Sequence, residues 1–337
     1  MLLRDACQED CGADSGGGDS SQGRNRKRAF AHGRKPLNAE RKARRKEAFS
    51  LSMRDYVALT KPKILWLLLL VALASAVIAA RTLPPIVTLV GLFLAGTLSS
   101  MGSLALNSYL EMDVDAKMKR TRNRPLPAER IVQPRRALAF GLALLAIGLL
   151  ISWFTLTPLA TLFIGLGALV YVQVYTVWLK PRTSWNIVLG GFAGSCCALA
   201  GWFAVTTADP LIAGVLAALV FVWTPSHFWS LAVITEEDYS AAGIPMLPSV
   251  VGEKKAAKFI VANTLLLIPI SLLFYLYLAG TGEIIYLAGA LFFDVLLLST
   301  NIKLLLTPNK SNALLAFKAS SPFLAVVFIL ACVSVLL

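Results

Sequence analysis

Three oxygen-bearing side chains stand four residues apart at the end of an apolar run. Asn107, Glu111 and Asp115 occupy positions i, i+4 and i+8. On a helix, this spacing puts them on one stripe about 80° wide and about 12 Å long. Carboxylate and amide oxygens are ligands that Mg²⁺ prefers, and this ion commonly bridges protein carboxylates to substrate phosphates. The spacing therefore predicts a magnesium site that also receives a phosphorylated substrate.

Basic side chains follow these acids directly along the chain. They are Lys117, Lys119, Arg120, Arg122 and Arg124. Pro125 biases the residue before it away from helical geometry, so this segment is predicted to be a turn or a loop. Guanidinium groups and metal ions together can neutralise a diphosphate. A solvated charged loop would explain the bases but not the acids, so we interpret the pair of motifs as a diphosphate site.

A second polar segment begins inside another apolar run. His227 is the only histidine beyond the first 50 residues, and it follows Pro225, which can kink a helix. The sequence leaves two interpretations open, a packed histidine and a functional one. Glu236, Glu237 and Asp238 come next. They either form a solvated helix end or, through Asp238, contribute to a second Mg²⁺ site.

Two further charged residues border or interrupt apolar runs. Lys180 ends one run, where it either anchors a helix at the membrane surface or reaches the diphosphate. Asp294 lies deep in another run, where a charge is expensive. The sequence assigns Asp294 no role.

The elements that must position these residues are membrane helices. The chain has 337 residues, of which 57% are hydrophobic and 15% charged. A soluble chain is about 45–50% apolar and about 25% charged, so a soluble enzyme, a disordered scaffold and a disulfide-stapled secreted module are excluded. Nine apolar runs, each near the length that crosses about 30 Å of hydrocarbon, predict nine spanning helices. The runs cover about 64–80, 86–106, 137–156, 159–179, 186–206, 211–233, 258–279, 284–306 and 320–337.

The net charge of +13 is distributed as membrane topology predicts. Residues 1–63 hold 15 of the 32 Lys and Arg residues. With this end inside, only Arg81 lies in an outer loop, so the N-terminus is predicted to be cytoplasmic and the C-terminus outside. The inner loops are then 107–136, 180–185, 234–257 and 307–319.

The sequence also predicts two parts of different character. Residues 1–50 lack apolar periodicity and are predicted to be a disordered, basic cytoplasmic tail, whereas 51–337 form the transmembrane domain. The tail contains acids, which mitochondrial transit peptides avoid. A prokaryotic plasma membrane is therefore favoured, with the mitochondrial inner membrane as the alternative. We expect the lipid bilayer, and not a nucleic acid, to be the partner that the basic charges serve.

Three strings give the chain a resemblance to a known family. They are Asn107…Glu111…Asp115-Ala-Lys-Met-Lys-Arg-Thr-Arg-Asn-Arg-Pro125, Tyr175-Thr…Leu-Lys180…Thr183…Asn186-Ile and Pro225…His227-Phe-Trp-Ser-Leu-Ala…Asp238-Tyr239…Pro248. Over about 54–325, the chain resembles the UbiA-type intramembrane prenyltransferases, and among them the heme O synthases. Sister enzymes carry a second DxxxD motif where this chain has His227 and then Glu-Glu-Asp-Tyr.

The resemblance implies a fold and a reaction. The fold is an all-α, polytopic membrane protein with nine transmembrane helices around a central cavity. The reaction is the Mg²⁺-dependent transfer of farnesyl from farnesyl diphosphate to a vinyl group of heme B, which gives heme O for terminal oxidases. A heme A synthase or an oxidase assembly protein is the protein partner that this would suit.

The resemblance also implies roles for individual residues. Mg²⁺ would be bound, in the service of catalysis, by Asn107, Glu111, Asp115 and Asp238. The diphosphate would be bound by Lys119, Arg120, Arg124 and Lys180. The heme would lie against His227 and Trp229. Two positions depart from the family pattern. Glu111 replaces an aspartate, and Pro181 stands where a basic residue is usual.

Two other functions fit parts of the sequence. A sister prenyltransferase acting on a quinone precursor or a chlorophyll-type acceptor would share the diphosphate site but leave His227 without a role. A transporter would give Asp294 a role. Against a transporter, no internal repeat is obvious, and the charged clusters lie at one face instead of mid-membrane.

Overall fold

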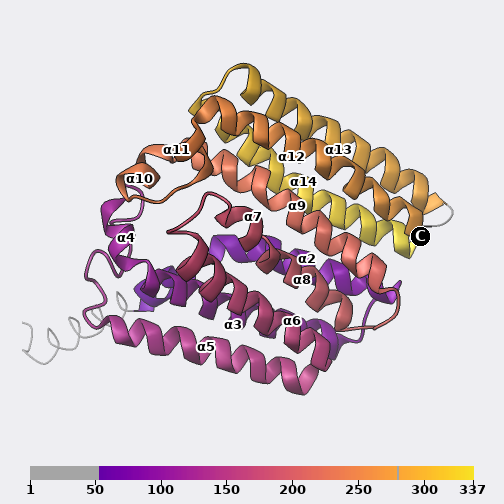
Figure 1. The fold of residues 1–337 in the computed structure, drawn as a ribbon. Helices are drawn as coiled ribbons and strands as arrows, with labels where there is room; N and C mark the ends of the chain where they lie inside the picture. The colour runs from indigo at the N-terminus through magenta and orange to yellow at the C-terminus, as the bar shows by residue number, and fades with distance from the viewer. Residues whose placement is uncertain (1–52, 279–280) are drawn as a thin grey trace, which may run out of the picture. The chain divides into compact units, whose positions relative to one another are not determined.

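The computed structural model describes residues 53–278 and 281–337, and within them every regular element is a helix (Figure 1). The predicted disordered tail, residues 1–50, lies outside the described residues.

Nine helices in the described part of the chain are long and apolar enough to cross a membrane, which confirms the predicted number. They are α2 (Pro62–Ala80), α3 (Ile86–Leu110), α5 (Pro134–Thr155), α6 (Pro158–Leu169) continued by η1 (Val170–Leu179), α7 (Asn186–Gly190) followed by α8 (Phe192–Phe203), α9 (Pro210–Ile234), α12 (Glu253–Leu273) continued by η2 (Phe274–Tyr277), α13 (Thr281–Leu306) and α14 (Lys310–Leu336). Three short helices, α4 (Met112–Lys117), α10 (Glu236–Ala241) and α11 (Leu247–Val251), lie between them. The chain is therefore an all-α, multi-pass membrane protein.

The starts of the long helices follow from local sequence. Proline opens α2, α5, α6 and α9, where the first backbone N–H has no intrahelical partner to lose. The side chain of Asn309 accepts a hydrogen bond from the backbone N–H of Asn312 and begins α14 at Lys310. The predicted loop 307–319 is therefore wrong over most of its length, because this cap starts the helix ten residues before position 320.

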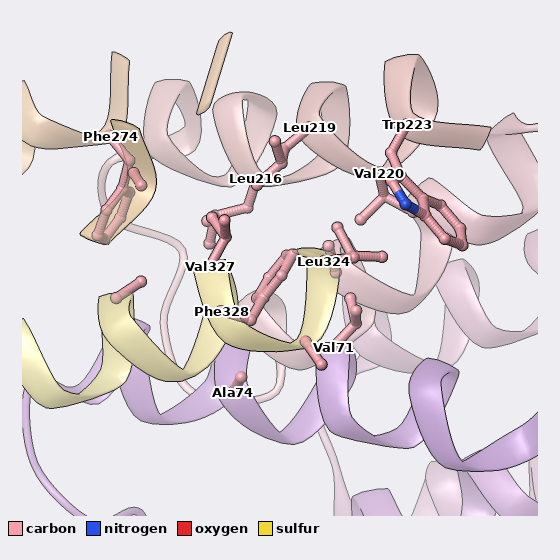
Figure 2. Packing of buried hydrophobic residues seen from close by; sticks show 14 of the residues in the cluster. Val71, Ala74, Leu216, Leu219, Val220, Trp223, Phe274, Leu324, Val327 and Phe328 are labelled. Carbon is pink, nitrogen blue, oxygen red and sulfur yellow. The ribbon is translucent and has the colours of Figure 1, made fainter. Parts of the chain in front are cut away.

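Helices α2, α8, α9, α12, α13 and α14 all contribute to the largest cluster of buried apolar side chains, and α9 and α14 contribute most. Figure 2 shows part of this cluster, with Phe328 and Leu324 of α14 between Val71 of α2 and Leu216 of α9. Lipid is as apolar as these side chains, so helix association in a membrane depends on close packing and interhelical hydrogen bonds. Both occur here, since the indole N–H of Trp223 on α9 donates to a backbone oxygen of α14 at 2.8 Å.

Close packing also fixes α3, the helix that carries the first polar motif. A Cβ on Gly102 would lie 2.6 Å from the backbone nitrogen of Leu145 on α5. Glycine at this position therefore allows the two backbones to touch. Since Gly102 lies little more than one turn before Asn107, the contact with α5 anchors the end of the helix from which the polar side chains project.

Candidate functional site

The first polar motif lies at the junction of α3 and α4. Helix α3 ends at Leu110, and Glu111 stands between the two helices. The hydrogen-bond pattern nevertheless continues, because the N–H of Glu111 donates to Asn107 O at 3.0 Å and that of Asp115 donates to Glu111 O at 2.7 Å. All three side chains are buried. The helical spacing that predicts a common stripe is therefore kept, although the helix is interrupted at Glu111.

Each of these three side chains is bonded to a cationic group from another part of the chain. Lys61 Nζ donates to Asn107 Oδ1 at 2.6 Å. Lys180 Nζ donates to Glu111 Oε1 at 2.6 Å, and Arg124 Nη1 donates to Asp115 Oδ2 at 2.7 Å. The structure therefore brings Lys180 and Arg124 to the acidic stripe, as the diphosphate-site prediction requires, and adds Lys61.

An unusual helix positions Lys180. The final ten residues of the fourth membrane helix, η1, form a π-helix, in which the N–H of Lys180 donates to Tyr175 O at 2.9 Å. In the same helix, Thr176 Oγ1 accepts a hydrogen bond from Asn107 Nδ2 at 3.1 Å. π-Helical segments are rare and often occur at functional sites. Here the wider turn lets one helix contact both Asn107 and Glu111.

Lys61 is held by an uncommon backbone conformation. Its φ of 47° lies in the left-handed region, which costs a non-glycine residue roughly 1–3 kcal/mol. The turn just before α2 directs its side chain to Asn107, 46 residues away. A strained backbone that places one partly buried lysine on a predicted metal ligand indicates a constraint beyond membrane anchoring.

Lys61 and Lys180, which are both partly buried, differ in their pKa shifts. Burial lowers the pKa of Lys61 to about 7, and the nearby Arg124 guanidinium acts in the same direction, against Glu111 and Asp115. Burial also acts to lower the pKa of Lys180. There the carboxylate of Glu111 prevails, through its charge and its hydrogen bond, and raises that pKa above its ordinary value.

The basic segment is a loop, as predicted, and Asp238 holds its backbone. Residues 118–133 form turns and contain no helix. Asp238 Oδ1 accepts from the N–H of Lys119 at 2.9 Å, and Oδ2 accepts from that of Arg120 at 3.2 Å. The structure thus joins the two inner segments through Asp238, whose recorded bonds go to the loop backbone instead of the acidic stripe. The Lys119 and Arg120 side chains are exposed.

His227 faces α14. Its ring stacks between Trp223, at 4.4 Å between centroids, and Phe317, at 4.5 Å. Nδ1 lies 2.5 Å from Ser320 Oγ, and the Ser320 hydroxyl donates to Phe317 O at 2.8 Å. A hydroxyl has one proton, so this pattern makes Nδ1–H the donor to Ser320 and leaves a lone pair on Nε2. Such a nitrogen can accept a hydrogen bond or bind iron.

Trp229 lies on a different side of α9 from His227. The two residues are two positions apart, which is about 200° on a helix. The Trp229 ring packs in the cluster around Ile187, edge-on to Phe259 of α12 at 6.3 Å between centroids. Its buried indole N–H has no hydrogen-bond partner among the described residues. The structure therefore does not gather the two predicted heme residues on one surface.

The donor set fits one kind of metal site. No group of three or more His, Cys, Asp or Glu side chains that could hold a metal ion occurs in residues 53–278 and 281–337. The polar stripe offers two carboxylates and one amide oxygen, from Glu111, Asp115 and Asn107. Mg²⁺ is usually held by one or two carboxylates together with water and substrate phosphates. The residues therefore fit a metal shared with a phosphorylated substrate, and not one caged by protein alone.

The sequence alone did not identify three residues that contact the predicted site residues, namely Lys61, Thr176 and Ser320. Lys61 counted only as a cytoplasmic positive charge, and Thr176 and Ser320 had no distinguishing feature. The one available indication was the pair of basic residues on either side of Pro62, at the start of a membrane helix. Contacts between residues 46, 69 and 93 positions apart became visible only in the fold.

Comparisons with known proteins find relatives across most of the chain. The model of the UbiA prenyltransferase family matches residues 68–333. Protoheme IX farnesyltransferase 1 of Cenarchaeum symbiosum is 41% identical over 283 residues, which are 82% of this chain and 94% of the relative. The protoheme IX farnesyltransferase of Metallosphaera sedula is 42% identical over 275 residues, again 82% and 94% of the two chains.

Solved structures share the fold. A digeranylgeranylglyceryl phosphate synthase superposes with a TM-score of 0.68 at 20% identity, over 84% of this chain and 98% of the other. A UbiA homolog from Archaeoglobus fulgidus, bound to DMAPP and Mg²⁺, gives a TM-score of 0.63 at 17% identity, over 84% and 99% of the two chains.

Proposed function

The chain belongs to the UbiA prenyltransferase family, and we propose that it transfers the farnesyl group of farnesyl diphosphate to a vinyl group of heme B, giving heme O and diphosphate. One observation carries the proposal. Relatives named protoheme IX farnesyltransferase are 41–42% identical to this chain over 82% of its length. The family makes the chain an enzyme that transfers prenyl groups, and these relatives indicate the donor and the acceptor.

The acidic stripe and its cations support the first half of the reaction. The bond between farnesyl C1 and the diphosphate oxygen breaks, and the leaving group departs with the electron pair. Asn107, Glu111 and Asp115 would hold Mg²⁺, whose positive charge stabilises the leaving diphosphate. Lys180 and Arg124 lie at the same stripe and can donate to the remaining phosphate oxygens. Lys119 and Arg120, whose side chains are exposed on the loop, would bind the outer face of the diphosphate.

Asp238 contributes to this site from α10. Its two hydrogen bonds hold the backbone of Lys119 and Arg120, four and five residues after Asp115. In this proposal Asp238 would bind the metal through a remaining lone pair of one carboxylate oxygen while it still holds the loop.

His227 supports the second half of the reaction. The terminal vinyl carbon of heme bonds to farnesyl C1, water adds to the cation next to the ring, and a proton leaves, which forms the hydroxyl. The lone pair on His227 Nε2 suits an iron ligand or a group that orients the acceptor. Trp229 lies on another side of α9, so the acceptor part of the proposal rests on His227 and not on Trp229.

The membrane context forms part of the proposal. The distribution of Lys and Arg supports a prokaryotic plasma membrane protein with a cytoplasmic N-terminus and a C-terminus outside. The diphosphate site would then face the cytoplasm, where a water-soluble leaving group can depart. Heme A synthase or an oxidase assembly protein would receive the product.

A reconstitution tests the proposed function. Purified protein is incubated with heme B, farnesyl diphosphate and Mg²⁺, and the heme is analysed by mass spectrometry. We expect heme O, and we expect its formation to stop when EDTA removes the metal. Unchanged heme B from folded, monodisperse protein would contradict the proposal.

A further inference from the structure

Each of the three oxygen-bearing side chains on the acidic stripe is already bonded to a cationic side chain. Hydrogen bonds of 2.6 to 2.7 Å join Lys61 to Asn107, Lys180 to Glu111 and Arg124 to Asp115. A divalent ion on these oxygens would stand within a few ångströms of the same three cations. Like charges at such distances repel strongly in a buried site. A metal ion that binds through these same oxygens therefore displaces the three cations.

The side chains of the three cations can change partners independently of one another. They come from three separate segments, the turn before α2, the end of η1 and the loop after α4. Lysine and arginine are long side chains with several donors each, and every one of these three has a single recorded side-chain hydrogen bond. Rotation about side-chain bonds can therefore redirect each cation without moving its backbone.

The displaced cations need new partners, because a buried cation without one is costly. A diphosphate bridged to the metal offers them acceptors at the same place. Mg²⁺ alone would displace the cations without offering new acceptors, and a diphosphate alone would find the cations engaged. Each ligand thus removes the obstacle that opposes the other.

We propose that Lys61, Lys180 and Arg124 exchange partners when substrate binds: each moves from a metal ligand to the diphosphate. Metal and diphosphate then bind weakly alone and tightly together. Lys61 thereby becomes a diphosphate-binding residue. This inference rests on the proposed function only in requiring a site for a metal and a diphosphate. By linkage, the factor by which diphosphate tightens metal binding equals the factor by which metal tightens diphosphate binding.

The test measures Mn²⁺ binding by electron paramagnetic resonance, with the full chain in nanodiscs and with inorganic pyrophosphate as the second ligand. Complexes of Mn²⁺ with pyrophosphate in solution are titrated separately and subtracted. We expect pyrophosphate to tighten Mn²⁺ binding at least about tenfold, within the usual range of coupling between two sites. Equal Mn²⁺ affinities with and without pyrophosphate would overturn the proposal.

Lys61→Met is the sharpest variant, because its partner Asn107 is neutral and no buried charge loses its counter-ion. We expect Mn²⁺ alone to bind about threefold or more tightly, and pyrophosphate in the presence of Mn²⁺ to bind about tenfold less tightly, so that the coupling factor shrinks. Lys63→Met is the matched control, since Lys63 is exposed on the other side of Pro62. Lys61→Arg should restore the coupling. A Lys61→Met protein with wild-type values for both ligands would overturn the exchange.

The two proposals fail separately. Heme O formation without coupling between Mn²⁺ and pyrophosphate would overturn the exchange and leave the proposed function standing. Coupling in a protein that makes no heme O would support the exchange and overturn the choice of acceptor.

Discussion

Buried acids occur both at the end of α3 and in the middle of α13, and their partners differ. Glu111 and Asp115 are paired with Lys180 and Arg124. Asp294 is only 1% exposed, and its recorded hydrogen bond joins Oδ2 to Ser271 Oγ on α12 at 2.6 Å. Asp294 Oδ1 has no partner in the described part of the chain. The first pair of acids is balanced by charge, whereas Asp294 is bonded only to a hydroxyl.

The difference indicates two uses of a carboxyl group in a membrane. Ion-paired acids can exchange one cation for another, as a metal site requires. A carboxyl without a cation is expensive to ionise in hydrocarbon. Ser271 Oγ also lies 2.8 Å from Ile268 O, and donation there would leave Asp294 to donate its own proton to Ser271. We therefore expect Asp294 to be neutral and to join α12 to α13, which gives the transporter alternative no support.

The largest expected effect comes from neutralising the paired acids. Glu111→Gln and Asp115→Asn should each lower turnover by at least about 100-fold, because each removes a charged metal ligand. Heme O formation at limiting Mg²⁺ is the measurement. Asp113→Asn is the control, since Asp113 is exposed on the same short helix. Near-normal turnover in Glu111→Gln would contradict its assignment as a ligand.

A smaller effect should separate two arginines of the loop. Arg124→Ala should weaken farnesyl diphosphate binding by about 10- to 150-fold, the value of a hydrogen bond to a charged group. Arg120→Ala should weaken it less, because the Arg120 side chain is exposed and Arg124 lies on Asp115. Binding of both substrates is measured by titration. A loss confined to heme affinity would assign the loop to the other substrate.

His227→Ala should affect the acceptor and spare the diphosphate. We expect heme affinity to fall by about tenfold, the loss of one directed bond to a buried group, while pyrophosphate binding is unchanged. If Nε2 binds iron, the Soret band of the bound heme shifts as well. A wild-type spectrum with normal turnover would leave His227 as a packing residue between Trp223 and Phe317.

The smallest effect on turnover and stability is expected from a substitution of Asp294, the acid without a cationic partner in the described part of the chain. Asp294→Asn keeps the shape and a donor for Ser271, so turnover should change by less than about threefold and the thermal midpoint by a few degrees at most. Activity and unfolding are measured on the same preparation. A loss comparable to that of Glu111→Gln would show that Asp294 belongs to the working machinery, and the contrast between the two regions would be false.

The sequence was sufficient for the features that chain periodicity controls. Nine helices follow from hydropathy because lipid permits few other structures for a spanning segment, and the acidic stripe follows from a spacing of four. The π-helix at Val170–Leu179 could not be predicted, because its apolar residues also suit an α-helix. Lys61 could not be placed, since its bond to Asn107 depends on how α2 packs beside α3. The start of α14 at Lys310 was not predicted, because the polar residues around the Asn309 cap suggest a loop.

The central claim is that this site joins a farnesyl group to heme, and acceptor competition tests it most directly. Purified protein receives farnesyl diphosphate, Mg²⁺ and equal concentrations of heme B and a hydroxybenzoate quinone precursor, and mass spectrometry identifies the prenylated product. The account predicts heme O and an unmodified hydroxybenzoate. A prenylated hydroxybenzoate with unchanged heme B would contradict it, and would make the chain a sister enzyme with the same diphosphate site and a different acceptor.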